Sequence, residues 1–144
     1  MNQVDYHQLR RSLVLLAGQR SLLARGFAAR VTGILPELGE RLRGEPSDQL
    51  AMALLEAARC ALYWQNIEPM LQRSGRDLAT IGVRSRDYEM LCHCWVSLLA
   101  EMLGEAWDEP LEHAWQSIGR AFFDTMRESS DSEHGIAQAV AVYD

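Results

Sequence analysis

Residues 76–95 read RDLATIGVRSRDYEMLCHCW, and this stretch contains the junction from which the rest of the chain can be interpreted. A short apolar helix is predicted to end at the dipeptide GV, residues 82–83. The SRDY turn that follows places Ser85 as the N-cap of a long helix. That helix carries Cys92, His93 and Cys94 in succession. The stretch therefore raises the question of whether either side of the junction holds a metal or a cofactor.

Helical periodicity extends from this junction in both directions. Apolar residues recur at spacings of three and four, which is typical of amphipathic helices. Helices are predicted over residues 4–18, 20–35, about 48–66, 69–79, 85–103 and 109–128. Pro69 is taken as the start of the fourth of them, because proline favours the first helical turn. The segment between the second and third helices, PELGERLRGEPSD, is predicted as a connector.

The fold class predicted from these elements is all-α, with about six to seven helices in one domain over residues 1–128. No strand alternation of useful length precedes residue 129. The run RESSDSEHG is a polar helix breaker in this interpretation, followed by a short apolar tail. Residues 129–144 are therefore predicted to lie outside the domain.

Composition excludes several classes of protein. The chain has 144 residues, a net charge of -6 and a pI near 5.2, so binding to nucleic acid or to an anionic membrane is not expected. It contains no apolar run of about 18 residues and no signal-peptide layout at its start. Three cysteines without zinc-ribbon or thioredoxin spacing favour reduced thiols. These features predict a cytoplasmic protein.

Four segments resemble the bacterial globins, in particular single-domain haemoglobins and the haem domains of flavohaemoglobins. The segment ILPEL is similar to the end of that family's second helix, and LAMALLEAARCALYWQNIEPML is similar to its distal helix and the following turn. GVRSRDYEML resembles the start of the penultimate helix, and LGEAWDEPLEHAWQSIGRAFFDTM resembles the last helix. The resemblance covers about residues 5–128 and implies a globin-like fold.

The same resemblance assigns haem-contact positions, and most of them are substituted. Leu78 occupies the position of the iron-ligating proximal His, and leucine has no lone pair for iron. Leu42 replaces the Phe that packs on the haem, Pro46 lies near the position of the distal Gln, and Ala28 replaces the Tyr that contacts bound oxygen. Tyr88, usual in the family, is retained. On these departures we expect no cofactor and, in particular, no haem.

Other side chains in this region can ligate iron or another metal, but the pattern favours structural roles. No histidine lies between residues 47 and 92, whereas Met52, Cys60 and Met70 do and are expected in the core. Successive helical residues diverge by about 100°, so the CHC triplet cannot converge on one ion. We expect Cys92 in the core and His93 at a partly exposed or subunit-contact position. No metal site is predicted.

No nucleophile elbow or phosphate-binding glycine loop is present, so we predict no catalytic residues and no enzymatic activity. The leading hypothesis is a non-haem, globin-like regulatory or protein-interaction module, in bacterial signalling. The resemblance to globin-like domains of stress-signalling proteins implies a homodimer through helices 85–103 and 109–128. The expected contact residues are His93, Ser97, Trp107 and Phe123. The alternatives are a haem-based oxygen or nitric-oxide globin with a non-standard ligand, or a globin that binds an apolar ligand.

Overall fold

The computed structural model describes the backbone of residues 3–143 and the side chains of residues 3–132. Within the described residues it contains seven α-helices, two short 3-10 turns and no strand, so the all-α prediction is confirmed. The helices are α1 (Gln3–Leu15), α2 (Arg20–Ile34), α3 (Pro36–Leu42), α4 (Glu45–Arg59), α5 (Trp64–Thr80), α6 (Tyr88–Leu103) and α7 (Glu109–Tyr143). None of the described helices is long and apolar enough to cross a membrane.

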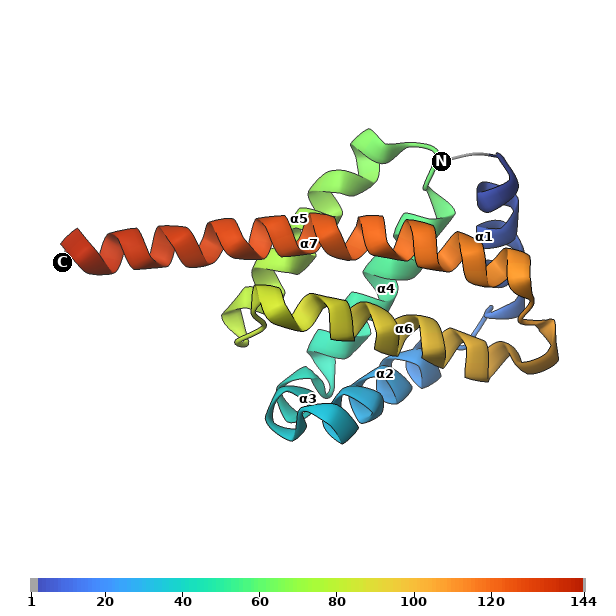
Figure 1. Cartoon of the computed structure of the whole chain (residues 1–144), viewed down its shortest axis with the longest axis horizontal. Helices are drawn as coiled ribbons and strands as arrows, with labels where there is room; N and C mark the ends of the chain where they lie inside the picture. Colours follow the sequence, from blue (N-terminus) through green and yellow to red (C-terminus); the bar gives the residue numbers. More distant parts are fainter. Residues whose placement is uncertain (1–2, 144) are drawn as a thin grey trace.

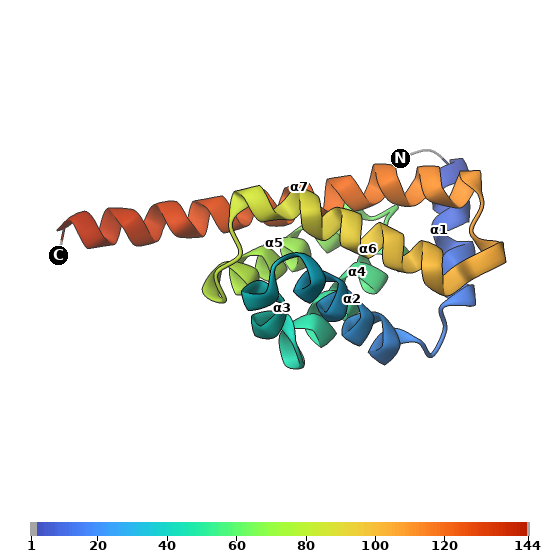
Figure 2. The same cartoon turned by 60° about the horizontal axis from the view of Figure 1, so that its bottom comes forward.

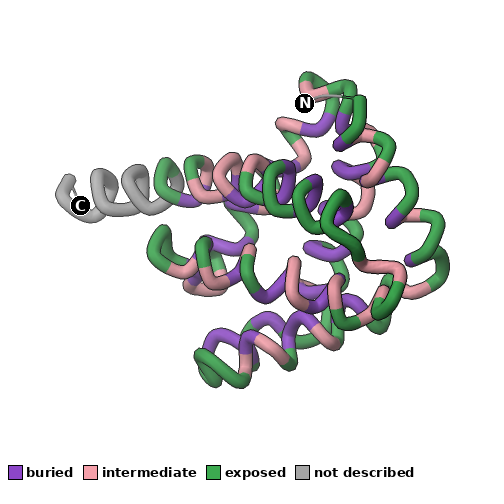
Figure 3. The backbone as a smooth tube through the Cα atoms, turned by 45° about the vertical axis from the view of Figure 1, so that its right-hand side comes forward, coloured by how far each residue is buried: buried purple, intermediate pink, exposed green. Residues whose placement is uncertain are grey.

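The longest helix, α7, crosses the whole body and extends past it at its carboxyl end (Figure 1). Viewed from the side, α6 and α7 form one layer, and α2, α3 and α4 lie below them (Figure 2). Helix α5 packs closely against α7. A Cβ atom on Gly75 of α5 would lie 2.2 Å from the carbonyl oxygen of Met126, so glycine is required at this crossing. Buried residues face inward between the layers, and exposed residues cover the outer surfaces (Figure 3).

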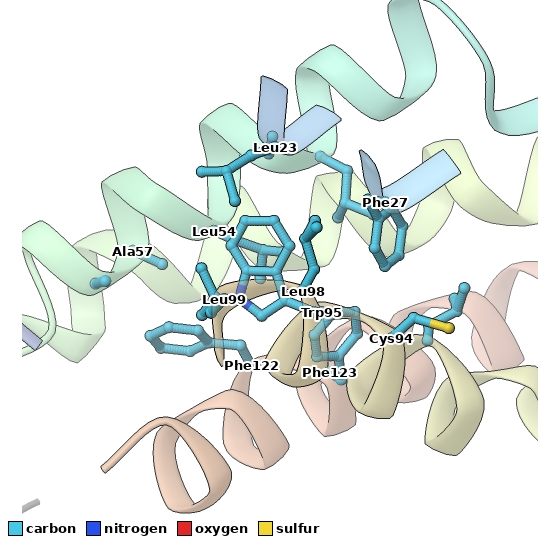
Figure 4. Close-up of a cluster of buried hydrophobic side chains, with 14 of the residues drawn as sticks. Leu23, Phe27, Leu54, Ala57, Cys94, Trp95, Leu98, Leu99, Phe122 and Phe123 are labelled. Atoms are coloured by element: carbon cyan, nitrogen blue, oxygen red, sulfur yellow. The ribbon is translucent and has the colours of Figure 1, made fainter. Parts of the chain in front are cut away.

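A connected set of aromatic rings occupies the core between these layers. Trp95 of α6 lies at its centre, among leucines of α2, α4 and α6 (Figure 4). Its ring centroid is 6.1 Å from that of Phe27 on α2 and 6.1 Å from that of Trp115 on α7, both in edge-to-face geometry. The indole N–H of Trp115 donates to the hydroxyl of Ser12 at 2.9 Å, which ties α1 to the same core.

The junction at residues 82–83 ends α5 as predicted, through a glycine-based Schellman motif. Gly82 has a φ of 98° and its N–H donates to the carbonyl of Ala79 at 3.1 Å. The N–H of Val83 donates to the carbonyl of Leu78 at 3.1 Å. These two bonds satisfy carbonyls at the helix end. They leave the apolar Val83 in the hydrophobic core together with Leu78.

The predicted N-cap at Ser85 is wrong in detail. Ser85 belongs to a 3-10 turn, Ser85–Asp87, and the turn is held by Asp87, whose carboxylate accepts the backbone N–H of Arg84 at 2.8 Å. Helix α6 then begins at Tyr88. An aspartate closes such a turn as readily as a serine, because both side chains accept backbone N–H groups.

The predicted connector between residues 36 and 48 is largely helical. Pro36 starts α3, where its missing N–H is no loss, and α4 already begins at Glu45. Helices α2 and α3 approach very closely at Gly39, where a Cβ atom would lie 2.0 Å from the Thr32 hydroxyl. The glycines that suggested a loop therefore serve a helix contact and, at Gly44, a turn with a φ of 84°.

The boundary between the third and fourth predicted helices is also displaced. Helix α4 ends at Arg59, and α5 begins at Trp64 with Pro69 inside it. Proline in this position removes the hydrogen bond to the carbonyl of Gln65, an exposed residue in the first turn of α5. Pro69 therefore does not mark the start of the helix.

The predicted breaker RESSDSEHG, residues 127–135, is absent, because α7 runs without interruption to Tyr143. The hydroxyl of Ser129 donates to the carbonyl of Gln72 on α5 at 2.7 Å, and Ser130 is fully buried. These contacts keep the first polar residues on the helix, and the segment contains no proline to stop it. The side chains of the predicted tail, residues 136–143, lie outside the described residues.

Leu78 is 3% exposed, as expected of a core position, and its truncation should be costly. Leu78→Ala is expected to lower the free energy of unfolding by about 2–5 kcal/mol, because it removes buried methyl groups and leaves a cavity. Urea or guanidinium unfolding followed by far-UV circular dichroism measures this change.

Met52→Ala is the matched control, because Met52 is 49% exposed on α4 and its truncation should change stability by less than about 0.5 kcal/mol. Equal stability of Leu78→Ala and the wild type would show that Leu78 does not support the packing of α5.

Candidate functional site

A cleft of about 390 Å³ opens between the start of α4 and the end of α5, beside the α5–α6 junction. Its floor is formed by Leu50 and Leu78, each 3% exposed. Pro46 and Ile81, both half-buried, form its apolar walls. The rim is polar and consists of Glu45, Gln49, Ser74, Asp77 and Thr80. We call this hollow the α4–α5 cleft, and its volume lies within the range of small-molecule sites.

The polar rim of the α4–α5 cleft offers mainly hydrogen-bond acceptors. The amide of Gln49 donates to the carboxylate of Glu45 at 2.9 Å. The hydroxyl of Ser74 donates to the carbonyl of Met70 at 3.2 Å, and that of Thr80 donates to the carbonyl of Asp77 at 2.6 Å. Since each hydroxyl has its single proton engaged within α5, only its lone pairs remain for a ligand.

The structure separates the residues at the predicted haem-contact positions. Leu78 and Pro46 line the α4–α5 cleft. Leu42 is fully buried and Ala28 is 3% exposed, so both contribute to the core. Tyr88 lies on the far side of the junction, at the start of α6. Of the five positions that the resemblance assigned to haem contact, only those of Leu78 and Pro46 line the α4–α5 cleft.

The lining of the α4–α5 cleft does not fit haem ligation. Haem iron is held by the side chain of His, Cys, Met or Tyr, and none of these residue types lines the cleft. No Lys or Arg lines it to pair with the haem propionates. Arg41 donates to the carbonyl of Ile81 at 3.5 Å but is not among the lining residues. Met70 and Cys60 pack against the core, and Met52 is half exposed.

A second, larger hollow of about 870 Å³ follows the outer face of α6 and α7, and we call it the α6–α7 groove. Its floor contains the apolar side chains of Tyr88, Cys92, Val96 and Phe123. Its sides are polar and charged: Glu89, His93, His113, Gln116, Ser117, Arg120, Asp124 and Arg127. Both acidic and basic groups therefore border one surface.

The predicted contact residues are only partly gathered in this groove. His93 is exposed on its side, and Phe123 belongs to its floor. Phe123 is 1% exposed, so it is already packed within the single chain and does not project toward a partner. Ser97 does not line the groove and donates to the carbonyl of His93 at 2.7 Å, while Trp107 lies half-buried in the link between α6 and α7.

Cys92, which was expected in the core, lies instead at the edge of the core. Cys94 is 2% exposed and belongs to the core, whereas Cys92 is half-buried and lines the α6–α7 groove. Cys94 is buried because α6 packs on α2 as well as on α7. Burial raises the pKa of both thiols, which keeps them protonated near neutral pH. Among the described residues no group of three His, Cys, Asp or Glu could hold a metal ion.

Tyr88 combines deep burial with an unpaired hydroxyl. It is 2% exposed, and neither its hydroxyl nor that of the buried Ser130 on α7 has a well-aligned hydrogen-bond partner within the described part of the chain. Burial raises the pKa of Tyr88 to about 12, and the nearby Ser130 hydroxyl offsets part of the rise. Loss of water around the phenolate thus dominates at this site.

Comparison with solved structures identifies the fold. An engineered carbene transferase, made from a candidate nitric oxide dioxygenase of Rhodothermus marinus, superimposes with a TM-score of 0.78 at 20% identity, over 98% of this chain and 99% of that one. A bacterial globin from Campylobacter jejuni superimposes with a TM-score of 0.72 at 19% identity, over 90% of this chain and 99% of that one. The chain has the globin fold. No protein-family model and no curated protein sequence matches it.

The expectation that the protein takes no cofactor is contradicted by these comparisons. Both structural relatives share the globin fold, which packs its helices around a haem pocket, and globins bind haem through a proximal His. The substitutions at Leu78, Leu42, Pro46 and Ala28 were therefore too narrow a basis for excluding haem. They show only that the proximal His of the family is absent at position 78.

Sequence reasoning missed the two features that shape the hollows. Glu45 and Gln49 are four residues apart, a spacing that predicts one helix face, but the segment was interpreted as a connector. Arg120 and Asp124 also share a helix face, and they were left unassigned. In both cases the spacing signal was present, while the partner helix was unknown.

The raised pKa of Tyr88 predicts a loss of stability at alkaline pH. Unfolded Tyr88 ionises near 10.0, whereas the folded residue keeps its proton until about 12, so the unfolded state binds fewer protons in this window. The contribution of protonated Tyr88 to the free energy of unfolding is fully present below pH 10 and is lost as the pH rises toward 12.

Tyr88→Phe should reduce this alkaline loss by about 1 kcal/mol at pH 11, measured by urea unfolding at pH 9, 10 and 11. Tyr63→Phe is the control for the loss of one phenol hydroxyl, because Tyr63 is 64% exposed. Identical pH profiles for Tyr88→Phe and the wild type would mean that the hydroxyl is hydrated in the folded protein.

Proposed function

We propose that this protein is a globin-fold regulatory module in bacterial signalling, which acts by protein contacts and forms a homodimer through the α6–α7 groove. The observation that supports this proposal is the groove itself, a hollow of about 870 Å³ with an apolar floor and charged sides. It lies on two neighbouring helices, α6 and α7. The proposal assigns no catalysis to the chain.

The charges beside the groove suit pairing with an identical surface. Glu89 and Asp124 are acidic, and Arg120 and Arg127 are basic, so one face presents both signs. In a two-fold dimer the same patch meets itself in reversed direction, which allows acidic groups of one copy to face basic groups of the other. Such complementarity sets orientation and rejects partners with the wrong pattern.

The floor of the groove supplies the apolar part of a contact. Val96 and Cys92 are half-buried in the single chain, so a partner that covers the groove removes their remaining surface from water. Tyr88 and Phe123 are already buried and give this floor a rigid base. The polar sides would form the rim of such an interface, as is usual for protein contacts.

Arg120→Glu tests the proposed dimer. Reversal of this exposed charge should place two like charges against each other in every dimer and weaken association about tenfold or more. Sedimentation-velocity centrifugation over a range of protein concentrations measures the dissociation constant.

Arg73→Glu, a reversal on the exposed side of α5, is the matched control and should leave the dissociation constant unchanged. A protein that stays monomeric at high concentration, or a dimer that Arg120→Glu does not weaken, would rule out the α6–α7 groove as the interface.

A second candidate function is a haem-based oxygen or nitric-oxide globin or gas sensor. It is favoured by the fold shared with a bacterial globin and with a candidate nitric oxide dioxygenase. On this proposal the iron ligand would come from outside the lining of the α4–α5 cleft, and Cys60, Met70 and His93 are the first residues to examine.

The second candidate predicts a saturable Soret band at one haem per chain when the purified protein is titrated with hemin. Substitution of each proposed ligand, Cys60→Ala, Met70→Leu and His93→Ala, should then shift or remove the band in one variant only. Weak absorbance that rises linearly without saturation would exclude this candidate. The titration is independent of the dimer test, so each function can fail alone.

A further inference from the structure

We infer that the α4–α5 cleft is a binding site for a small apolar molecule that carries an amine. This inference goes beyond the proposed function, because it concerns a different surface from the α6–α7 groove. It rests on the shape of the cleft, on the apolar side chains at its floor and walls, and on the kind of hydrogen-bonding groups at its rim.

The floor of the cleft selects an apolar body. Leu50 from α4 and Leu78 from α5 meet at the bottom, and Pro46 and Ile81 cover the two sides. A volume of about 390 Å³ accommodates a two-ring aromatic molecule or a comparable aliphatic one. Contact with these side chains removes apolar surface of the ligand from water, which is the main source of affinity in such sites.

The rim of the cleft selects a hydrogen-bond donor. The carboxylates of Glu45 and Asp77 accept hydrogen bonds and cannot donate them. The hydroxyls of Ser74 and Thr80 already donate to carbonyls within α5, so they face a ligand as acceptors. Gln49 has one of its two N–H groups engaged by Glu45, so it keeps one N–H and its carbonyl oxygen and can both donate and accept.

Charge acts in the same direction as hydrogen bonding. Two exposed carboxylates border the cleft, and no basic side chain lines it. Arg41 donates to the carbonyl of Ile81 at 3.5 Å, on the junction side of the cleft, and does not line it. A protonated amine is therefore attracted to the rim, and a carboxylate on the same apolar body is repelled.

A matched pair of ligands tests this inference directly. 1-Naphthylmethylamine and 1-naphthoic acid share one apolar body and carry opposite charges at pH 7. The amine should bind the full-length protein saturably at one site per chain, and the acid should bind roughly tenfold more weakly or not at all. Isothermal titration calorimetry measures both, and NMR shifts of the Leu50 and Leu78 methyl groups report where the ligand lies.

Two variants connect the binding to the cleft. Glu45→Gln combined with Asp77→Asn keeps the shape of the rim and removes its charge, so the preference for the amine should fall to about twofold or less. Gln49→Trp places a large side chain over the opening from an exposed position and should abolish binding of the amine. Met52→Trp, on the same helix and outside the cleft, is the control and should bind as the wild type does.

Circular dichroism and the thermal midpoint establish that each variant is folded. Equal binding of the amine and the acid, or amine binding that survives Gln49→Trp, would overturn the inference. Absence of any saturable amine binding to the wild type would overturn it as well. If Gln49→Trp proves unfolded, the charge-neutral double variant still decides the result, because it alters no volume.

Discussion

The close crossing of α5 and α7 at Gly75 is the constraint on which the α4–α5 cleft and the course of α7 depend. No side chain fits between α5 and the backbone of Met126, so the two helices are held at backbone contact. This contact fixes the carboxyl end of α5, where Leu78 forms the floor of the α4–α5 cleft. It also places Ser129 against Gln72, which carries α7 beyond the point where its polar sequence predicts a break.

The aromatic core holds α6 in place between α2 and α7. Trp95 contacts Phe27 on α2 and Trp115 on α7, so α6 is positioned between the two layers by its largest side chain. With Trp95 facing inward, Cys92 and His93 face the outer side. The α6–α7 groove is thus a consequence of core packing, and its polar sides consist of residues of α6 and α7 that lie outside the core.

The two hollows differ in chemistry in a way that separates their proposed roles. The α6–α7 groove is long and bears charges of both signs, which suits a macromolecular surface with the same mixture. The α4–α5 cleft is less than half that volume, has an apolar floor and is bordered mainly by acceptors, which suits a small donor molecule. Both lie next to the junction at residues 81–88, since Ile81 lines the cleft and Tyr88 lines the groove. A shift of this junction would therefore affect both surfaces.

Sequence by itself determined the helical class, the termination of α5 just before Gly82 and the globin-like order of helices. These features depend on local backbone preference and on apolar periodicity, which a single chain displays directly. Tertiary structure alone decided that residues 36–42 form a helix and that α7 continues past Ser129. Both depend on contacts with another helix, at Gly39 and at Ser129, whose energy exceeds the local preference of glycine or serine. The missing proximal His was visible in the sequence, but the chemistry of the cleft beside Leu78 was not, because its rim is assembled from two helices whose relative placement only packing defines.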